Sequence, residues 1–545
     1  MDDFSVTFGN ARTLAFADPF EVVRADSAAG LDAALDRCQA ALDAGAWIAG
    51  FIAYSGEAAL GVFGAPKTSD LPDPAGVTHA PLLATAERDA YDAAIAHLQR
   101  AIYEGYVYQV NYTLPFDLAY QGDPLDFYAY YARRSGAGYQ AYVRDGNRAI
   151  ASWSPELFLE FDGRRLRTKP MKGTAALDRI DELGTPKNRA EHVMIVDLLR
   201  NDLHRICDDV TVERFLEIER YPTYATMTST IAGTPRAGTS LARIFAAVFP
   251  CGSITGAPKR AAMRFIAETE VAPRGAYCGT IGYLSPECKG WWNVAIRTAQ
   301  LDASTGFGRY DTGGGIVADS QASAEWAEIL LKSRFLRPAA PFAVLETFAS
   351  DADDATLALH LTRLSRSAHA FGIPYRQASV ASAVLSQRSE SKGQGDRVVR
   401  IRLQLDGTVE VRTEAANTPP EPLRVCFSGA RVRSDDPFLR HKTSWRPAHD
   451  EAFVEARERD CFDAMLINER GEVTEGARTN LFVERDGALW TPSASSGVLP
   501  GVLRAHLLRD GRAREAELTV PDVRAAQTVY VGNSARGLLR ATVVD

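Results

Sequence analysis

The first chemistry that the sequence suggests involves Lys172 and Glu156. A strand-like run ends at Asp162-Gly163, a pair that favours a two-residue hairpin turn. If the turn has two residues, Glu156 faces Lys169 across the hairpin. Lys172 then lies roughly 10 Å further along the strand, at the same end of the hairpin as Glu156. A carboxylate there could take a proton from the lysine and make it nucleophilic, although an exposed ion pair on a sheet edge fits the same spacing.

Carboxylates recur in two helix-like segments of the same half. Glu191 lies at the start of one of them, and Glu325 and Glu328 are spaced to share one face of the other. Like charges on one face repel unless a cation lies between them or water solvates each, and the spacing allows both arrangements. Just upstream, the glycines of 313–315 leave backbone N–H groups open to the approach of an anion.

The second half contains three features of a different chemistry. Lys442 could form an imine, Glu475 could pair with a pyridinium nitrogen, and Pro500-Gly501 leads into a helix whose amides could meet a phosphate. Each feature alone is commonplace, because a proline and a glycine before a helix more often mark only its N-terminus.

Helices and strands are mixed in both halves without regular βαβ alternation, which favours an α+β architecture. Asp-Gly turns are expected at 162–163, 406–407 and 486–487. Helical periodicity is present at 31–42, 91–103, 191–203, 241–248, 322–335 and 357–371.

Proline and small residues interrupt this periodicity at 337–342 and at 415–422. The first stretch separates a helix-like run from a new strand, so we expect two domains, 1–337 and 338–545. The second stretch lies between strand signals and is expected to be an internal connection.

Composition excludes several classes of protein. The 545 residues include 61 basic and 69 acidic side chains, a net charge of −8, and no Lys/Arg block, so a nucleic-acid partner is not expected. No run has the roughly 18 apolar residues of a membrane span, and the first residues are acidic, unlike a signal peptide, so a cytoplasmic location without membrane attachment is expected. The seven scattered cysteines suggest neither disulfides nor a zinc site.

Seven motifs over residues 10–336 resemble, in order, those of the chorismate-utilising enzymes. The resemblance implies a chorismate-binding β-sandwich flanked by helices. The motifs lie at 154–158, 169–174, 190–202, 250–259, 277–283, 293–298 and 313–332.

The segment Pro170-Met-Lys-Gly-Thr174 is similar to that of the aminodeoxychorismate synthases, since anthranilate synthases carry a small residue in place of this lysine. By this resemblance Lys172 attacks C2 of chorismate as the 4-hydroxyl departs, Glu156 serves as its base, and ammonia displaces the lysine by adding at C4. A covalent intermediate divides one hard substitution into two steps.

The same resemblance assigns the remaining residues of this site. Glu191 and Glu328 resemble Mg²⁺ ligands, with Glu325 in support, and Mg²⁺ favours such oxygen ligands. Arg297 and Tyr277 resemble contacts to the pyruvyl carboxylate. Contacts to the anion are implied for Gly173, Thr174, Gly313 and Gly315. Two departures, at 174–176 and 224–229, concern substrate positioning rather than the reaction class.

The source of ammonia is expected to lie outside this chain. A class I glutaminase needs a Gly-x-Cys-x-Gly turn, and no cysteine here has one. The resemblance therefore implies free ammonia or a separate glutaminase subunit.

Residues 342–545 resemble the fold-type IV pyridoxal phosphate enzymes, through motifs at 360–368, 439–444, 471–482, 497–504 and 531–537. By resemblance Lys442 is the Schiff-base lysine and proton shuttle, and Glu475 holds the pyridinium proton. The phosphate is assigned to Arg363, Ser534 and the amides of Val502 and Leu503. Since relatives of this type are usually dimers, a homodimer through this domain is implied. The first hairpin of the relatives is expected to be shortened or supplied by the upstream domain.

The two resemblances fit one pathway. The first half would make 4-amino-4-deoxychorismate, an amine, and the second would eliminate pyruvate from it to leave 4-aminobenzoate, a folate precursor. One alternative is an anthranilate- or isochorismate-type synthase fused to a class IV aminotransferase. Another is a scaffold with one inactive half, against which the retained lysines and glutamates argue.

Overall fold

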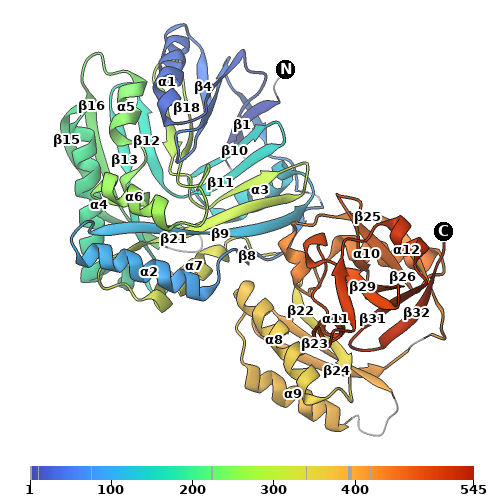
Figure 1. Cartoon of the computed structure of the whole chain (residues 1–545). Coiled ribbons are helices and arrows are strands. Elements are labelled where there is room, and N and C mark those ends of the chain that lie inside the picture. The colour runs from blue at the N-terminus through green and yellow to red at the C-terminus, as the bar shows by residue number, and fades with distance from the viewer. Residues whose placement is uncertain are drawn as a thin grey trace. The chain divides into compact units, whose positions relative to one another are not determined.

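A computed structural model describes residues 3–9, 12–74, 76–175, 177–221, 225–338, 340–390, 396–417 and 419–545. The chain divides into two compact units, Met1–Arg337 and Pro338–Asp545. Figure 1 shows helices and strands interleaved along the chain in both, as the α+β prediction requires. None of the described helices is long and apolar enough to cross a membrane.

The first unit is built on two large antiparallel sheets. The first sheet consists of β1 (Phe4–Phe8), β2 (Arg12–Phe16), β6 (Lys67–Asp70), β7 (Thr78–His79), β8 (Leu83–Ala84), β9 (Gln109–Gln121), β10 (Tyr139–Asp145), β11 (Arg148–Ser154), β17 (Gly256–Ala257), β20 (Thr298–Asp302) and β21 (Phe307–Ile316). The second consists of β3 (Glu21–Ala25), β4 (Trp47–Ile52), β5 (Ala58–Phe63), β12 (Leu157–Asp162), β13 (Leu166–Lys169), β14 (Met171–Ala175), β15 (Cys207–Arg220), β16 (Ala225–Pro235), β18 (Thr280–Leu284) and β19 (Lys289–Asn293).

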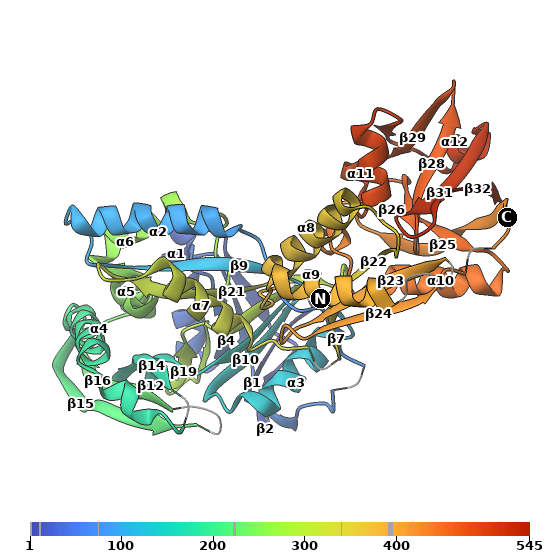
Figure 2. The same ribbon diagram turned by 90° about the horizontal axis from the view of Figure 1, so that it is seen from below.

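Helices cover the outer faces of this sandwich. They are α1 (Ala28–Asp43), α2 (Arg88–Tyr103), α3 (Pro124–Ser135), α4 (Pro186–His204), α5 (Leu241–Val248), α6 (Lys259–Thr269) and α7 (Ala322–Ser333), with short 3-10 turns at Ile180–Gly184 and Gly252–Ile254. Apolar residues of α1, α4 and α5 pack on the second sheet, and those of α2, α3 and α6 on the first. Between the sheets lies a separate aromatic core that includes Phe8, Phe16 and Phe51. In Figure 2, α4 lies beside the long β15–β16 hairpin at one end of the unit.

The sheet order brings reactive residues to one region. The second sheet runs β14-β16-β13-β12-β19-β18-β4-β5-β3, so β14, which carries Lys172, is an edge strand. In the first sheet β21, which carries the glycines of 313–315, lies between β9 and β20. The site therefore forms where an edge of one sheet approaches a strand of the other.

The expected register of the first hairpin is wrong. Phe161 pairs with Leu166, so the turn has four residues, and Leu157 rather than Glu156 faces Lys169. The physical reason is the Asp162 side chain, whose Oδ1 accepts hydrogen bonds from the two following turn amides at 2.9 and 2.7 Å and opens the turn. At Asp486-Gly487 the two-residue turn is confirmed, because Arg485 pairs directly with Ala488.

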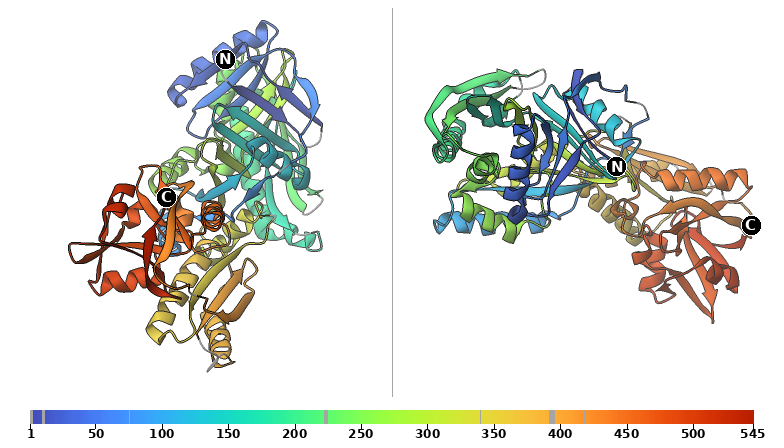
Figure 3. Two further views of the ribbon diagram at one scale, coloured as in Figure 1. Left: turned by 90° about the vertical axis from the view of Figure 1, so that its right-hand side faces the viewer. Right: turned by 90° about the horizontal axis from the view of Figure 1, so that it is seen from above.

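The second unit has two sheets of its own. The smaller comprises β22 (Ala343–Ala349), β23 (Arg397–Gln404) and β24 (Val409–Ala415). The larger comprises β25 (Leu423–Val432), β26 (Asp463–Asn468), β27 (Val473–Gly476), β28 (Asn480–Arg485), β29 (Ala488–Pro492), β30 (Ala513–Ala516), β31 (Thr528–Asn533) and β32 (Gly537–Val543). In Figure 3 the amber strands of the smaller sheet form a layer distinct from the orange and red strands of the larger one.

Helices complete the second unit: α8 (Asp354–Ala370), α9 (Gln377–Glu390), α10 (Pro447–Glu458), α11 (Val502–Arg509) and α12 (Val520–Ala525), with 3-10 turns at Pro437–Arg440 and Ala494–Ser496. A backbone bridge joins Val344 of β22 to Thr443, next to Lys442, and the Leu345 N–H donates to the Lys442 carbonyl at 2.7 Å. The segment that carries Lys442 is thereby tied to the first strand of this unit.

Candidate functional site

Lys172 lies at the centre of the site in the first unit. Its Nζ forms an ion pair with Glu191 of α4 at 2.8 Å, and about a quarter of its side chain remains exposed. A methyl group placed on Gly315 would lie 3.5 Å from Nζ and 2.6 Å from Gln109 Nε2. The absence of a side chain at Gly315 therefore allows β21 to approach the lysine closely.

Glu156 is buried beside this lysine and is not its ion-pair partner. Burial raises the pKa of Glu156 to about 7, opposed by a hydrogen bond from Ser253, by the charge of Lys172 and by the Met171 amide. A carboxyl group with a pKa near neutrality can both accept and release a proton at the pH of the cell. Glu156 and Lys172 thus lie close together, as predicted, but they do not form an exposed salt bridge.

Polar atoms without partners line the space around Lys172. Gln109 Oε1, Glu156 Oε1 and His192 Nδ1 are buried and make no hydrogen bond within the described part of the chain. Burial, and then the charge of Lys172, lowers the pKa of His192 to about 4, so its ring is neutral near pH 7. Buried polar atoms are usually satisfied, so this concentration of orphans indicates a site built to bind a polar ligand.

Of the three glutamates predicted as metal ligands, Glu325 and Glu328 approach β21, whereas Glu191 pairs with Lys172. A methyl group on Gly314 would lie 3.3 Å from Glu325 Oε2 and 3.9 Å from Glu328 Oε1. Glu325 accepts a hydrogen bond from Ser320 at 2.7 Å, and Glu328 pairs with Lys332 at 2.7 Å. Among the residues that the structure describes, no group of three or more His, Cys, Asp or Glu side chains is placed to hold a metal ion.

Two residues predicted to contact the pyruvyl carboxylate lie near Tyr310. Tyr277 is buried, and burial raises its pKa well above the usual range. Arg297 has a φ of 50°, an uncommon backbone conformation for arginine, and its guanidinium lies 5.7 Å from the ring of Phe335. Both Tyr277 and Arg297 interact electrostatically with Tyr310.

The residues predicted to contact the substrate anion differ in their local surroundings. Gly173 has a φ of 74°, which favours glycine, and its carbonyl accepts a hydrogen bond from Thr226 at 2.6 Å. The Gly313 carbonyl accepts one from Lys332 at 2.7 Å. The side chain of Thr174 lies outside the described residues.

In the second unit Lys442 is half-buried. Burial lowers its pKa to about 8, opposed by the Glu346 carboxylate and assisted by the nearby arginines Arg363, Arg446 and Arg400. An amine with this pKa is neutral in roughly a tenth of molecules at pH 7, far more than an ordinary lysine, and only the neutral amine is a nucleophile.

Glu475 is held by three donors. Its carboxylate lies 3.1 Å from each of His449 Nε2, Asn480 Nδ2 and the Leu499 amide. The residue is 4% exposed, so the carboxylate is fixed in position within the protein. His449 and Asn480 were not predicted, although Asn480 lies inside a motif noted from the sequence.

Most of the predicted phosphate ligands lie at the start of α11. Gly501 precedes this helix without a side-chain cap, which leaves the amides of Val502 and Leu503 available to an anion. Arg363 donates to the Pro500 carbonyl at 3.0 Å and so lies beside the same helix start. Ser534 bonds instead to His360 Nε2 of α8 at 2.8 Å.

Glu346 is a buried residue that the sequence did not single out. It binds Arg363 through Nε at 2.8 Å and Nη2 at 2.7 Å, and His360 Nδ1 at 2.6 Å. Despite burial, the charges and hydrogen bonds of Arg363 and His360 lower the pKa of Glu346 to about 2. The carboxylate therefore stays ionised and orients the arginine.

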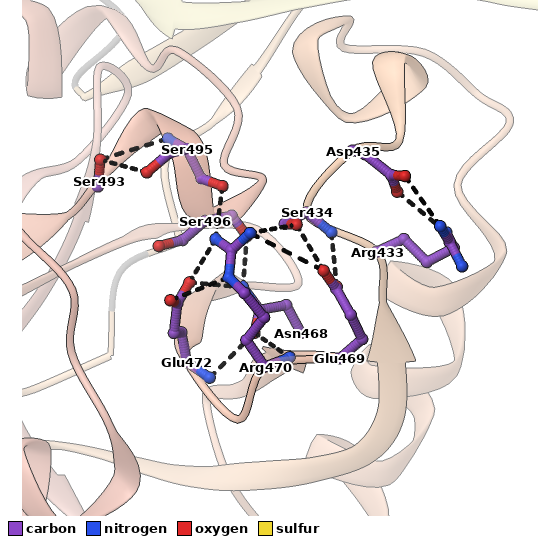
Figure 4. Close-up of polar contacts among 10 residues, drawn as sticks. All are labelled: Arg433, Ser434, Asp435, Asn468, Glu469, Arg470, Glu472, Ser493, Ser495 and Ser496. Carbon is purple, nitrogen blue, oxygen red and sulfur yellow. Dashed lines mark hydrogen bonds and ion pairs between the residues drawn. The ribbon is translucent and has the colours of Figure 1, made fainter.

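A surface network braces the loop that leads into α11 (Figure 4). Arg470 donates to Glu472 at 2.8 Å and to the Ser495 carbonyl at 2.8 Å, and Asn468 donates to the Ser496 carbonyl at 3.1 Å. Hydrogen bonds from Arg470, together with those from Asn468 and Ser496, lower the pKa of Glu472 to about 2. The β26–β27 turn thus anchors the segment just before Leu499 and Pro500.

Two family models match the chain. That of the chorismate binding enzymes matches residues 19–338, and that of the class IV aminotransferases, whose fold implies pyridoxal phosphate, matches residues 344–544.

Among curated relatives, aminodeoxychorismate synthase component 1 of Klebsiella aerogenes is 37% identical over 256 residues, 45% of this chain and 56% of the relative. The protein of the same name from Escherichia coli (strain K12) is 37% identical over 254 residues, 44% of this chain and 55% of the relative. Anthranilate synthase component 1 of Methanothermobacter marburgensis is 34% identical over 257 residues, 45% and 55% of the two chains. The chain spans slightly more than half the length of these relatives.

Solved structures agree with the fold of the first unit. The menaquinone-specific isochorismate synthase of Escherichia coli gives a TM-score of 0.53 at 20% identity, covering 61% of this chain and 88% of that one. Anthranilate synthase component I from Streptococcus pneumoniae gives 0.51 at 23% identity, covering 61% and 90%. At this identity the likeness establishes the fold alone.

Proposed function

Because the chain belongs to the family of chorismate binding enzymes, we propose that it aminates chorismate to 4-amino-4-deoxychorismate and then eliminates pyruvate to give 4-aminobenzoate. The observation that carries the proposal is that a partly exposed lysine, Lys172, lies close to a buried carboxyl group, Glu156, whose pKa is about 7. Two bacterial relatives that are aminodeoxychorismate synthase components are 37% identical to the chain over the part that aligns, against 34% for an anthranilate synthase component, which supports amination at C4.

The first reaction uses Lys172 as the nucleophile. Glu156 accepts its proton, the free amine adds to C2 of chorismate, both ring double bonds shift by one position, and the bond from C4 to the hydroxyl breaks as the proton held by Glu156 passes to that oxygen and water leaves. Ammonia then adds at C4, both double bonds shift back, the bond from C2 to Lys172 breaks, and Lys172 leaves as the amine while the new amine at C4 gives up its extra proton. Arg297 and Tyr277 are assigned to the pyruvyl carboxylate, since a guanidinium matches that group's geometry. We assign the contacts to the substrate anion to Gly173, Thr174, Gly313 and Gly315.

The three glutamates of this site supply the oxygen ligands that a divalent cation prefers, although among the described residues they do not form a cluster arranged for a metal ion. Glu191 and Glu328, with Glu325 in support, are the residues that would hold Mg²⁺. In the structure lysine ammonium groups neutralise Glu191 and Glu328 instead, at Lys172 and Lys332.

The second reaction uses Lys442 and Glu475. Pyridoxal phosphate, when bound, supplies an aldehyde for an amine and an electron sink. The buried amine of Lys442 fits a role in holding the cofactor and then moving a proton, and Glu475 fits a pyridinium partner because it is buried and fixed. We assign the binding of the cofactor phosphate to Arg363, Ser534 and the amides at the start of α11.

We assign the supply of ammonia to a separate glutaminase subunit. The two curated synthase relatives named above are called component 1, which fits a partner that supplies the second component. A homodimer through the second unit is part of the proposal.

The experiment is to incubate the purified chain, loaded with pyridoxal phosphate, with chorismate, ammonium and Mg²⁺ and to measure products by chromatography. We expect 4-aminobenzoate and pyruvate in equal amounts. Lys172→Ala should abolish both, whereas Lys442→Ala should let the aminated intermediate accumulate. Lys67→Ala, at an exposed lysine of β6, is the matched control and should leave both rates unchanged. Formation of anthranilate or isochorismate would refute the proposal.

A further inference from the structure

Two arginines of the second unit lie in sequence motifs that the proposed reaction has not used. Arg478 follows β27, and Arg536 lies in the turn between β31 and β32. Both guanidinium groups lie over the ring of Phe462, at 4.8 and 6.0 Å from its centre. Asn533 joins the two segments, because its side chain donates to the Arg478 carbonyl at 3.2 Å and accepts from the Arg536 amide at 3.1 Å.

Two further arginines complete the cluster. Arg446, just before α10, donates to the carbonyl of Ala477, the neighbour of Arg478, at 3.5 Å. Arg400 lies on β23, and its charge is felt by both Arg478 and Arg536. We call Arg400, Arg446, Arg478 and Arg536 the arginine cluster. Lys442 is part of the same neighbourhood. Arg446 follows it by four residues, and Arg400 pairs with Thr347 on β22, two residues from Leu345, whose N–H donates to the Lys442 carbonyl at 2.7 Å.

The cluster has more positive charge than its surroundings balance. Arg400 pairs with Glu414, and Arg446 with Asp450, and these two acids are about half exposed. Asp463 lies nearby, but its carboxylate already accepts hydrogen bonds from the Thr479 hydroxyl and the Arg478 amide. Within the described residues, neither Arg478 nor Arg536 forms an ion pair with a carboxylate.

Both unpaired arginines also keep an unused donor. The Nε atoms of Arg478 and Arg536 are buried and make no hydrogen bond in the described structure. Repulsion between like charges and buried donors without acceptors both raise the free energy of the folded chain. An anionic ligand would lower that free energy by accepting hydrogen bonds and neutralising charge. Of the residues assigned to the cofactor phosphate, Arg363 and the amides of Val502 and Leu503 lie at the start of α11. Ser534 shares the β31–β32 turn with Arg536, but its hydroxyl bonds to His360.

We propose that the arginine cluster binds the carboxylates of a dicarboxylate substrate whose amine is presented to the Lys442 site. This inference rests on the proposed function and specifies its substrate class. In 4-amino-4-deoxychorismate the two carboxylates are remote from the amine, one across the ring and one on the enolpyruvyl group. An ordinary amino acid has a single carboxylate, on the carbon that bears the amine. Four arginines are more than the binding of that one carboxylate requires.

The test uses the full chain loaded with pyridoxal phosphate, with the visible absorbance of the cofactor as reporter, because that signal arises only in the second unit. The probe is isophthalate, which has two carboxylates and no amine, and benzoate is the one-carboxylate comparison. We expect isophthalate to bind more tightly than benzoate, and less tightly as salt is raised. Arg478→Gln and Arg536→Gln should each weaken isophthalate binding at least tenfold with the cofactor still bound. Arg540→Gln, at an exposed arginine of β32, should change nothing.

Three results would overturn the inference: unchanged isophthalate affinity in both variants, loss of cofactor absorbance in them, or loss of a dimer on gel filtration. The second would assign the arginines to the cofactor phosphate, and the third to a subunit interface. If the wild-type chain makes no 4-aminobenzoate and yet the variants lose isophthalate binding, the subsite stands and the proposed reaction fails.

Discussion

Replacing Glu156 with glutamine should slow amination strongly and yet stabilise the protein at alkaline pH. The carboxyl group is buried, and its pKa is raised from 4.5 to about 7. Glutamine keeps the size of the side chain and cannot ionise. Its amide also cannot take the proton of Lys172, so kcat for amination should fall by roughly 10²- to 10⁴-fold.

The magnitude of the stability effect follows from proton linkage. Between pH 4.5 and about 7 the folded chain retains a proton on Glu156 that the unfolded chain has lost. Stability therefore falls as pH rises through this window, at about 1.4 kcal/mol for each pH unit. The cost is about 1 kcal/mol at pH 5 and about 3 kcal/mol at pH 8. The advantage of Glu156→Gln over the wild type should grow by about 2 kcal/mol between these two pH values.

Urea unfolding at pH 5 and pH 8, followed by tryptophan fluorescence, measures this difference, since five of the seven tryptophans lie in residues 1–337. Glu160→Gln is the matched control, because that side chain is 45% exposed and should show no such pH dependence. If the wild type and Glu156→Gln lose stability in parallel between pH 5 and pH 8, Glu156 is not a buried carboxyl group that titrates near neutrality, and its role as the base loses its physical support.

Three further outcomes are expected. The rate at which the cofactor-free chain takes up pyridoxal phosphate should rise with pH and level off above about 8, where the Lys442 amine is neutral, as stopped-flow absorbance would show; a flat profile would contradict the lowered pKa. Glu346→Gln should destabilise the second unit by about 3–5 kcal/mol in urea because it leaves a buried arginine unpaired, whereas Glu410→Gln, in an exposed pair, should cost less than about 1 kcal/mol. Gly315→Ala should lower kcat/KM for chorismate at least tenfold, because the added methyl group would push into the site. Gly138→Ala should leave kcat/KM unchanged, because nothing lies within 4 Å of a methyl group added there. Equal values in the two variants would contradict the close approach of β21 to Lys172.

Local chemistry in the sequence predicted much of the framework. The helices at 241–248 and 322–335 are present, with the second ending at Ser333, because their apolar spacing repeats every three to four residues. The Asp486-Gly487 turn is present because both residues tolerate positive φ, at 55° and 72°. Motif order along the chain was sufficient to predict the family.

Tertiary structure decided what each reactive group faces. The sequence placed Glu156 opposite Lys169, but a side-chain bond in the turn shifted that register, and a buried environment rather than a strand partner sets the acidity of Glu156. Lys172 pairs with Glu191, a contact between an edge strand and a helix that no local pattern encodes.

The arginine cluster shows the same division. Each arginine is visible in the sequence, but the four come from separate elements, and only folding brings their charges together, with Arg400 and Arg446 nearest to Lys442. Residue type and short-range spacing therefore determine which groups are available and which helices and turns form. Burial and long-range contacts determine their protonation and their partners, because both depend on surfaces that meet only when distant segments pack.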